Sequence, residues 1–405
     1  MGLRSVELFA GAGGLALGLD AAGVKHQAIV EWDHDACTTL RENRNNRVAP
    51  ICHWPEVTQG DVRQFDFSRV EGIDLIAGGP PCQPFSLGGK HRAFLDRRDM
   101  FPAAINGVRV AMPRGFIFEN VRGLTRSTFS NYFSHILLQL EFPHLVAKKN
   151  EEWLDHLARL ERHKTKGGES EYHVVSRVLD AADYGVPQRR ERVFIVGLRR
   201  DIGEEFSFPK STHSFEALLH SQWISGEYWE RHKVSKRSRP RMPEALQRKI
   251  GGLRDVYPSL LDRPWRTVRD AISDLPDPEK TPAGRLPQGH QFQPGARSYV
   301  GHTGSPLDEP SKALKAGDHG VPGGENMLRR PDGSVRYFTV RESARIQTFP
   351  DQYIFVGSWT ETMRQLGNAV PVELAACVAK GVSDKLRASK HSPANGKFQG
   401  STRRH

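Results

Sequence analysis

The sequence contains no uninterrupted apolar run of about 18 residues, so it offers no segment for a transmembrane helix. Its first residues also lack the apolar core of a signal peptide, because Glu7 stands where that core would lie, and we expect a cytoplasmic protein. Cysteine is scarce, with four residues and no Cys-x-x-Cys pair, which argues against a disulfide framework and favours a reducing compartment. The spacings of these cysteines and of neighbouring histidines fit no zinc site, so we expect no metal.

Positive charge is in excess. The 405 residues include 58 Lys and Arg against 47 Asp and Glu, a formal net charge of +11. The hydrophobic content of 38% is that of a globular chain, and the length predicts about two or three domains. An acidic polymer would suit such a chain as a partner, but many basic proteins owe their charge only to solubility. The charge by itself leaves both interpretations open.

Residues 5–199 alternate between short apolar runs of strand length and longer stretches of helical length. This alternation predicts an α/β fold in which helices cover a parallel sheet. Asp33 is the expected N-cap of the helix that follows the second strand. The expected strands are residues 6–9, 25–32, 73–77, 115–118, 174–179 and 192–198.

Between residues 201 and 336 the alternation gives way to Pro, Gly, Arg and Trp without periodicity, which predicts a second, irregular domain. Within it, residues 231–254 hold nine Lys or Arg against the single acid Glu244. This run could be a solvated charged face, but prolines interrupt it outside the regular sheet, and we favour contact with nucleic acid. Residues 141–171 resemble a charged helical insertion, and the residues from 386 onward a basic disordered tail.

The segment from Phe9 to Gly14 predicts a glycine turn between the first strand and the first helix. Such a turn lets the backbone approach a ligand closely at a helix N-terminus. Glu31 follows about twenty residues later, where a carboxylate can accept from both hydroxyls of a ribose. Asp61 is placed to accept from an adenine amino group, although a turn-forming role beside Gly60 would also explain it. These residues favour a nucleoside-type cofactor; a dinucleotide or a merely tight turn are the alternatives.

Three further clusters follow expected strands. Prolines on both sides of Cys82 exclude helix and regular sheet, so its thiol is held on a stiff loop and is a candidate nucleophile, although lone cysteines are usually structural. Glu119 comes directly beyond a buried strand, where desolvation would raise its pKa and make it a proton donor; a helix N-terminal acid is the alternative. Gln188, Arg190 and Arg192 share one face of a strand and suit a planar carbonyl-bearing substrate, unless they form a surface charge cluster.

Together these motifs resemble those of the cytosine-C5 DNA methyltransferases, in that family's order. The resemblance covers residues 4–200 and 337–380; each motif alone is weak, but eight in order are highly specific. The helical insertion near residues 145–170 departs from the family pattern. The motifs are residues 9–14, Glu31-Trp32, Asp61, Pro81-Cys82-Gln83, Glu119-Asn120-Val121, residues 188–192, residues 341–351 and residues 365–371.

The resemblance implies a Rossmann-like methyltransferase domain built from residues 1–200 and 362–385. Residues 201–361 would form a smaller irregular target-recognition domain and hinge, and residues 386–405 the tail. The implied cofactor is S-adenosyl-L-methionine. Its expected contacts are Phe9, Gly11, Gly13, Glu31, Trp32, Asp61, Val62, Pro81, Met100, Asn368 and Ala369.

The resemblance also implies a reaction. The Cys82 thiolate would attack C6 of a cytosine flipped out of duplex DNA, while Glu119 protonates N3 and Arg192 holds O2. Arg190 would pair with and orient Glu119, and Gln188 would support the loop. DNA contacts are expected from a mobile basic loop and from the strand entry, at Ser86, Lys90, Arg92 and Gln188.

The family's commonest setting implies a monomeric modification enzyme of a restriction-modification system, with a cognate endonuclease acting on the same site. An RNA methyltransferase with the same cysteine chemistry is the nearest alternative, and the large middle region favours DNA because a DNA reader needs extra surface. A non-catalytic DNA-binding relative is disfavoured because Cys82, Glu119, Arg190 and Arg192 are all present. A nicotinamide-dependent dehydrogenase would leave Pro81-Cys82 unexplained.

Overall fold

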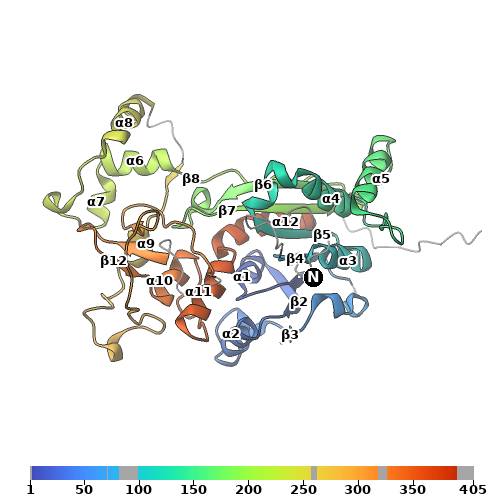
Figure 1. Ribbon diagram of the computed structural model, residues 1–405, viewed down its shortest axis with the longest axis horizontal. Helices are drawn as coiled ribbons and strands as arrows, with labels where there is room; N and C mark the ends of the chain where they lie inside the picture. The colour runs from blue at the N-terminus through green and yellow to red at the C-terminus, as the bar shows by residue number, and fades with distance from the viewer. Residues whose placement is uncertain (1, 71, 82–98, 257–261, 318–325, 390–405) are drawn as a thin grey trace, which may run out of the picture.

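A computed structural model describes residues 2–70, 72–81, 99–256, 262–317 and 326–389. Cys82, the loop residues Ser86, Lys90 and Arg92, and the expected tail from residue 390 lie outside the described residues. Figure 1 shows two parts side by side: a central sheet with helices on both faces, and a second part with little regular sheet.

Seven strands form the central sheet in the order β3-β2-β1-β4-β5-β7-β6. The first five strands in this order are parallel to one another, which confirms the predicted α/β fold, but β7 runs antiparallel to both β5 and β6. The expectation of a wholly parallel sheet is wrong there because only residues 181–190 join β6 to β7, and a parallel crossover needs about a dozen residues or more. The strands are β1 (Leu3–Leu8), β2 (Val24–Glu31), β3 (Val57–Gln59), β4 (Leu75–Gly78), β5 (Gly115–Val121), β6 (Tyr172–Asp180) and β7 (Glu191–Arg199).

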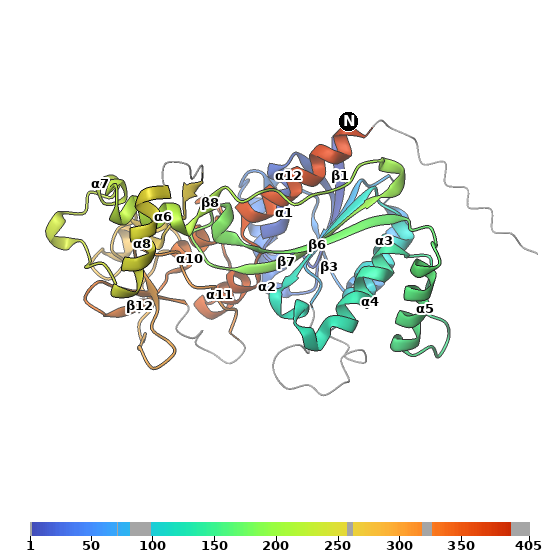
Figure 2. The same cartoon turned by 90° about the horizontal axis from the view of Figure 1, so that it is seen from above.

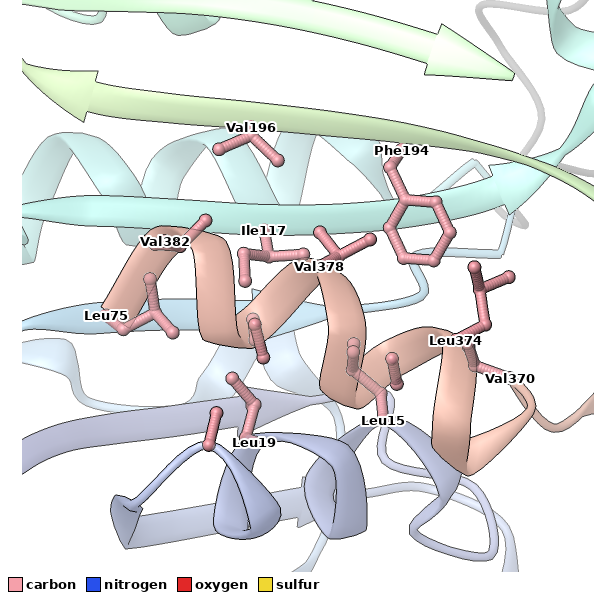
Figure 3. Packing of buried hydrophobic residues seen from close by; sticks show 14 of the residues in the cluster. Leu15, Leu19, Leu75, Ile117, Phe194, Val196, Val370, Leu374, Val378 and Val382 are labelled. Atoms are coloured by element: carbon pink, nitrogen blue, oxygen red, sulfur yellow. The ribbon is translucent and has the colours of Figure 1, made fainter. Parts of the chain in front are cut away.

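Helices α1 (Gly14–Ala21) and α12 (Val372–Ala388) cover one face of this sheet. Apolar residues Leu374, Val378 and Val382 recur every four positions of α12 and form one buried stripe. Figure 3 shows this stripe against Ile117 of β5 and Phe194 of β7. The packing brings the C-terminal helix beside the first helix of the chain.

Helices α3 (Phe101–Ala111) and α4 (Ser130–Glu141) cover the opposite face, where Val6 and Leu8 of β1 point. Helix α5 (Trp153–Thr165) belongs to the expected insertion and packs outside α4. Helix α2 (His34–Asn45) follows β2, and the side chain of Asp33 accepts from Ala36 N at 2.9 Å. The predicted N-cap at Asp33 is confirmed.

The second part begins after residue 202 and combines short helices with two small sheets. Its basic run continues into α8, and Lys236, Arg237, Arg241 and Arg248 are exposed there. The elements are β8 (His213–Ser214), α6 (Phe215–Trp223), α7 (Glu227–Arg231), α8 (Glu244–Val256), β9 (Arg263–Pro264), α9 (Val268–Ile272), β10 (Ser305–Pro306), β11 (Met327–Arg329) and β12 (Val335–Tyr337).

Helices α10 (Val340–Ile346) and α11 (Trp359–Asn368) connect the second part back to the sheet. Phe349 and Tyr353, which lie between them, pack in one buried cluster with Ala10 and Leu17 near the glycine turn. The Tyr353 hydroxyl also donates to the carbonyl of Ala12. This packing places residues 349–353 with the sheet domain, ahead of the boundary at 362 expected from the sequence.

No helix in the described ranges is long and apolar enough to cross a membrane. Among the same residues, no group of three or more His, Cys, Asp or Glu side chains is arranged to hold a metal ion.

Candidate active site

The glycine turn lies at the carboxyl end of β1 and leaves open space above it. Gly11 and Gly13 have φ angles of 53° and 81°, values that L side chains rarely adopt, and Phe9 shares this region with φ 55°. A Cβ at Gly13 would lie 3.0 Å from Leu40 Cδ2, whereas a Cβ at Gly11 would meet nothing within 4 Å. The turn is therefore closed toward α2 and open at Gly11, as a ligand cradle requires.

Glu31, at the end of β2, anchors this turn. Its Oε2 accepts from Gly11 N at 2.6 Å, and its Oε1 accepts from the backbone N–H groups of Trp32 and Asp33, each at 2.7 Å. Burial raises the pKa of this carboxyl, and the three backbone donors oppose that rise. The Trp32 side chain beside it is 69% exposed, so its ring is free to cover a ligand.

Asp61 differs from its expected role. It caps a short 3-10 turn by accepting from Arg63 N, and the Arg63 guanidinium binds the same carboxylate, with Nε 2.8 Å from Oδ2. Arg63 thereby lowers the pKa of Asp61. An adenine amino group would have to share this carboxylate with Arg63. The neighbouring Val62 is buried in the sheet core.

Residues from the C-terminal part reach the same edge of the sheet. A Cβ at Gly14 would lie 2.3 Å from the carbonyl oxygen of Val370, so the two chain segments are in close contact. Asn368 is exposed at the end of α11, and Ala369 is buried directly after it. Residues near the two ends of the chain, which the resemblance assigns to one domain, therefore lie against each other here.

The proline segment before Cys82 is fixed from two sides. Asn120 Nδ2 donates to Pro80 O at 2.8 Å, and Met100 N donates to Pro81 O at 3.0 Å. A Cβ at Gly79 would lie 3.2 Å from Glu119 Oε2. The carboxyl of Glu119 therefore lies against the backbone that leads to Cys82.

Glu119 itself lies within β5, which continues to Val121, whereas the position expected from the sequence was directly beyond the strand. It is 7% exposed, and Arg192 Nε lies 2.8 Å from its Oε1, off the direction of a good hydrogen bond, so the contact is mainly ionic. Burial raises the pKa of Glu119, and the charges of Arg192 and Arg190 oppose that rise. Burial therefore favours the protonated form of Glu119, which is the form that can donate a proton.

Arg190 does not pair with Glu119 as expected. Its guanidinium is 1% exposed and donates to three backbone carbonyls, Leu314 O at 2.8 Å, Ala369 O at 3.1 Å and Gly367 O. The pairing of Arg190 with Glu119 was an implication of the family resemblance. The structure instead places Arg190 at a crossing of three chain segments, from which its charge still acts on Glu119.

Gln188 is fully buried, which does not favour the expected DNA contact. Its Nε2 donates to Gln347 Oε1 at 3.0 Å, and its Oε1 accepts from Leu314 N at 2.9 Å. A contact with DNA would require the side chain to leave both partners. The side chain thereby joins two segments that are far apart in the sequence.

Sequence reasoning missed an ion pair at the rim of the site. Arg122 Nη1 lies 2.7 and 2.6 Å from the two carboxylate oxygens of Glu191, and the pair joins the ends of β5 and β7. The available signal was position, since Arg122 follows the Glu119-Asn120-Val121 motif and Glu191 directly precedes Arg192.

The fold and these strand-end residues define the class of protein: an α/β enzyme whose polar site lies at the carboxyl edge of its sheet. A model of the family described as "C-5 cytosine-specific DNA methylase" matches residues 3–144 and 143–384. The chain belongs to this family and is a DNA (cytosine-5-)-methyltransferase. The resemblance seen in the sequence motifs is confirmed.

Relatives support the assignment along the whole chain. Type II methyltransferase M.NgoMIV of Neisseria gonorrhoeae is 32% identical, over 96% of this chain and 99% of that protein. Type II methyltransferase M.PspPI of Psychrobacter sp. is also 32% identical, over 95% of this chain and 80% of that protein. The structure of S. pombe Dnmt2 methyltransferase has a TM-score of 0.52 at 17% identity, over 95% of this chain and 98% of that chain, and shows the fold alone.

Proposed function

We propose that the protein transfers a methyl group from S-adenosyl-L-methionine to C5 of a cytosine flipped out of a specific duplex DNA sequence. We further propose that it acts as a monomeric modification enzyme beside a cognate restriction endonuclease, a role suggested by its relatives named Type II methyltransferases. The observation that carries the proposal is the buried Glu119, held by Arg192 against the backbone that leads to Cys82.

The residues at the glycine turn fit the cofactor. The open space at Gly11, the Glu31 carboxylate beside it and the exposed ring of Trp32 offer room, hydroxyl acceptors and an aromatic face. The remaining cofactor contacts would come from Phe9, Gly13, Asp61, Val62, Pro81, Met100, Asn368 and Ala369. When bound, S-adenosyl-L-methionine supplies an electrophilic methyl group on a sulfonium.

Three side chains of the protein would activate the base. Addition of the Cys82 thiolate forms a sulfur–carbon bond at C6, and the electron pair that this displaces is taken up as N3 accepts the proton of Glu119. Arg192 would hold O2, where negative charge develops, at the same time as it holds Glu119. C5 then carries the electron density of an enamine. After methylation, loss of the C5 proton, expulsion of the Cys82 thiolate and return of the N3 proton to Glu119 restore the aromatic ring.

Duplex DNA requires two further functions. The target base must leave the stack, which costs a few kcal/mol, and the site sequence must be read. We assign the reading to residues 201–336, with phosphate contacts from the exposed Lys236, Arg237, Arg241 and Arg248. The loop with Ser86, Lys90 and Arg92 would close over the flipped base.

A covalent trap tests the chemistry. Duplex DNA in which 5-fluorocytosine replaces the target cytosine blocks removal of the group at C5, so the wild type with methyl donor should form a covalent complex that survives denaturation. Bisulfite sequencing of DNA from expressing cells identifies the target first. Cys82→Ala should bind the cofactor normally and form no complex. Absence of a complex with the wild type, or methylation of tRNA in place of duplex DNA, would overturn the proposal.

A further inference from the structure

A basic cavity flanks the candidate active site. It has a volume of about 500 Å³ and is lined by Arg122, Gly123, Thr125, Arg126 and Glu191. Four of these residues lie in the turns that follow β5, and Glu191 begins β7. We refer to this feature as the β5 rim cavity. Of its lining residues, Glu191 alone belongs to the motifs that identified the family.

Register fixes the place of this cavity relative to Glu119. Val121 of β5 pairs with Arg192 of β7, so Arg122 and Glu191 are the next pair beyond the residues that hold Glu119. From Glu119 to Arg122 the chain advances by three residues, which span about 10 Å when extended. In both views the chain between β5 and α4 lies at the end of the sheet domain nearer to the second part (Figures 1 and 2).

The charges in the cavity suit one phosphate group. Two guanidinium groups face one carboxylate, which leaves a net charge of about +1. Glu191 contacts Arg122 through Nη1 alone, so the other guanidinium N–H groups of Arg122 do not face this carboxylate. Arg126 is exposed and makes no ion pair within the described part of the chain. Its charge is available to a ligand.

The lining also excludes other ligands. Among the described residues, no aromatic or large apolar side chain lines the cavity, so none of them offers a surface on which a base could stack. A free pyrophosphate would carry more negative charge than the cavity can balance beside Glu191. A phosphodiester carries one negative charge and accepts hydrogen bonds from planar guanidinium groups.

We propose that the β5 rim cavity binds one backbone phosphate of the target strand, next to the flipped cytosine, through Arg126 and Arg122. This inference rests on the proposed function, because it needs a cytosine at Glu119. The contact holds the strand in register while the base enters the site. Arg126 is thus a positioning residue, and Arg122 acts with it through the guanidinium N–H groups that do not contact Glu191.

Salt dependence of DNA binding measures the contact. Arg126→Gln should weaken binding of a duplex carrying the target site by roughly tenfold at low salt. It should also reduce the slope of log affinity against log salt concentration by about 0.9, the value for one lost phosphate contact. Arg162→Gln is the matched control, since Arg162 is exposed on α5 at the opposite end of the sheet domain (Figure 1) and the change removes the same charge. The control should leave affinity and slope as in the wild type.

A duplex with a single neutral methylphosphonate locates the phosphate. At one position beside the target cytosine, the substitution should weaken the wild type by roughly tenfold and cause no further loss in Arg126→Gln. The inference would be overturned if the losses of affinity from Arg126→Gln and from the methylphosphonate added fully at every flanking position. Equal salt slopes for Arg126→Gln and Arg162→Gln would also overturn it. Thermal unfolding and cofactor binding of Arg126→Gln should match the wild type. The covalent trap reports separately on the proposed function, since Arg126→Gln should still form the complex at saturating DNA.

Discussion

Arg192 holds Glu119 across the boundary between β5 and β7, with Nε 2.8 Å from Oε1. Residues two apart on a strand point to the same face of the sheet. Glu119 is two residues from Ile117 and Arg192 is two residues from Phe194, so both side chains lie on the face that α1 and α12 cover. The pair is nearly closed to solvent, with side chains 13% and 8% exposed. Burial and the nearby cations therefore act on the pKa of Glu119 in opposite directions.

Replacement of Glu119 by Gln removes the proton donor and preserves the size of the side chain. We expect the methylation rate to fall by about 10² to 10⁴, the usual contribution of a positioned acid. DNA affinity should stay within about threefold, since the loss acts on a transition-state interaction. Single-turnover methylation and equilibrium binding measure the two effects. A rate equal to that of the wild type would remove N3 protonation from the mechanism.

The pH profile of Arg192→Gln tests the electrostatics of the pair. Protonated Glu119 is the active form, so the rate falls as pH rises through its pKa. Arg192 lowers this pKa, so its removal should raise the pKa further and move the alkaline limb of the profile to higher pH. The overall rate should also drop, because O2 of the base loses its partner. Arg162→Gln should keep the wild-type profile, and an unshifted or acid-shifted limb in Arg192→Gln would contradict the assignment.

Arg190 should matter for stability more than an ordinary charged residue. Its planar guanidinium reaches carbonyls of Leu314, Gly367 and Ala369, and a lysine ammonium cannot reproduce that fork. We expect Arg190→Lys to lower the free energy of unfolding by about 2 kcal/mol, the scale of one or two hydrogen bonds to a buried charge. Denaturant unfolding measures this change.

The neighbouring Arg189 provides the control for Arg190. Its side chain is 65% exposed and lies 3.7 Å from Asp180, so Arg189→Lys should change stability by less than about 0.5 kcal/mol. Equal losses in the two variants would show that the carbonyl contacts of Arg190 contribute nothing special.

Local patterns predicted the parts of the site that depend on nearby residues. The glycine turn, the N-cap at Asp33 and the buried acid at Glu119 each follow from residues within a few positions. The family resemblance assigned residues 365–371 to the same domain, and Val370 contacts Gly14 there. The partners of Arg190 and Gln188 could not be found in this way. Leu314 lies 124 residues beyond Arg190, in a region without periodicity, and only the folded backbone brings the two together.

Gly367 shows how tightly that crossing is packed. A Cβ at this position would lie 2.3 Å from Ala316 N and 2.4 Å from Lys315 C, both of them backbone atoms that cannot move aside. We expect Gly367→Ala to destabilise the protein by about 1–3 kcal/mol or more, the usual range for overpacking, although alanine favours a helix. Gly251→Ala in α8 is the control, because nothing lies within 4 Å of its Cβ position, and there alanine should stabilise by about 0.5–1 kcal/mol. Denaturant unfolding of both variants gives the comparison. If both Gly367→Ala and Gly251→Ala stabilised the protein, residues 315–316 would not pack closely against α11. The segments of Leu314 and Gly367, which Arg190 contacts, would then be able to move apart.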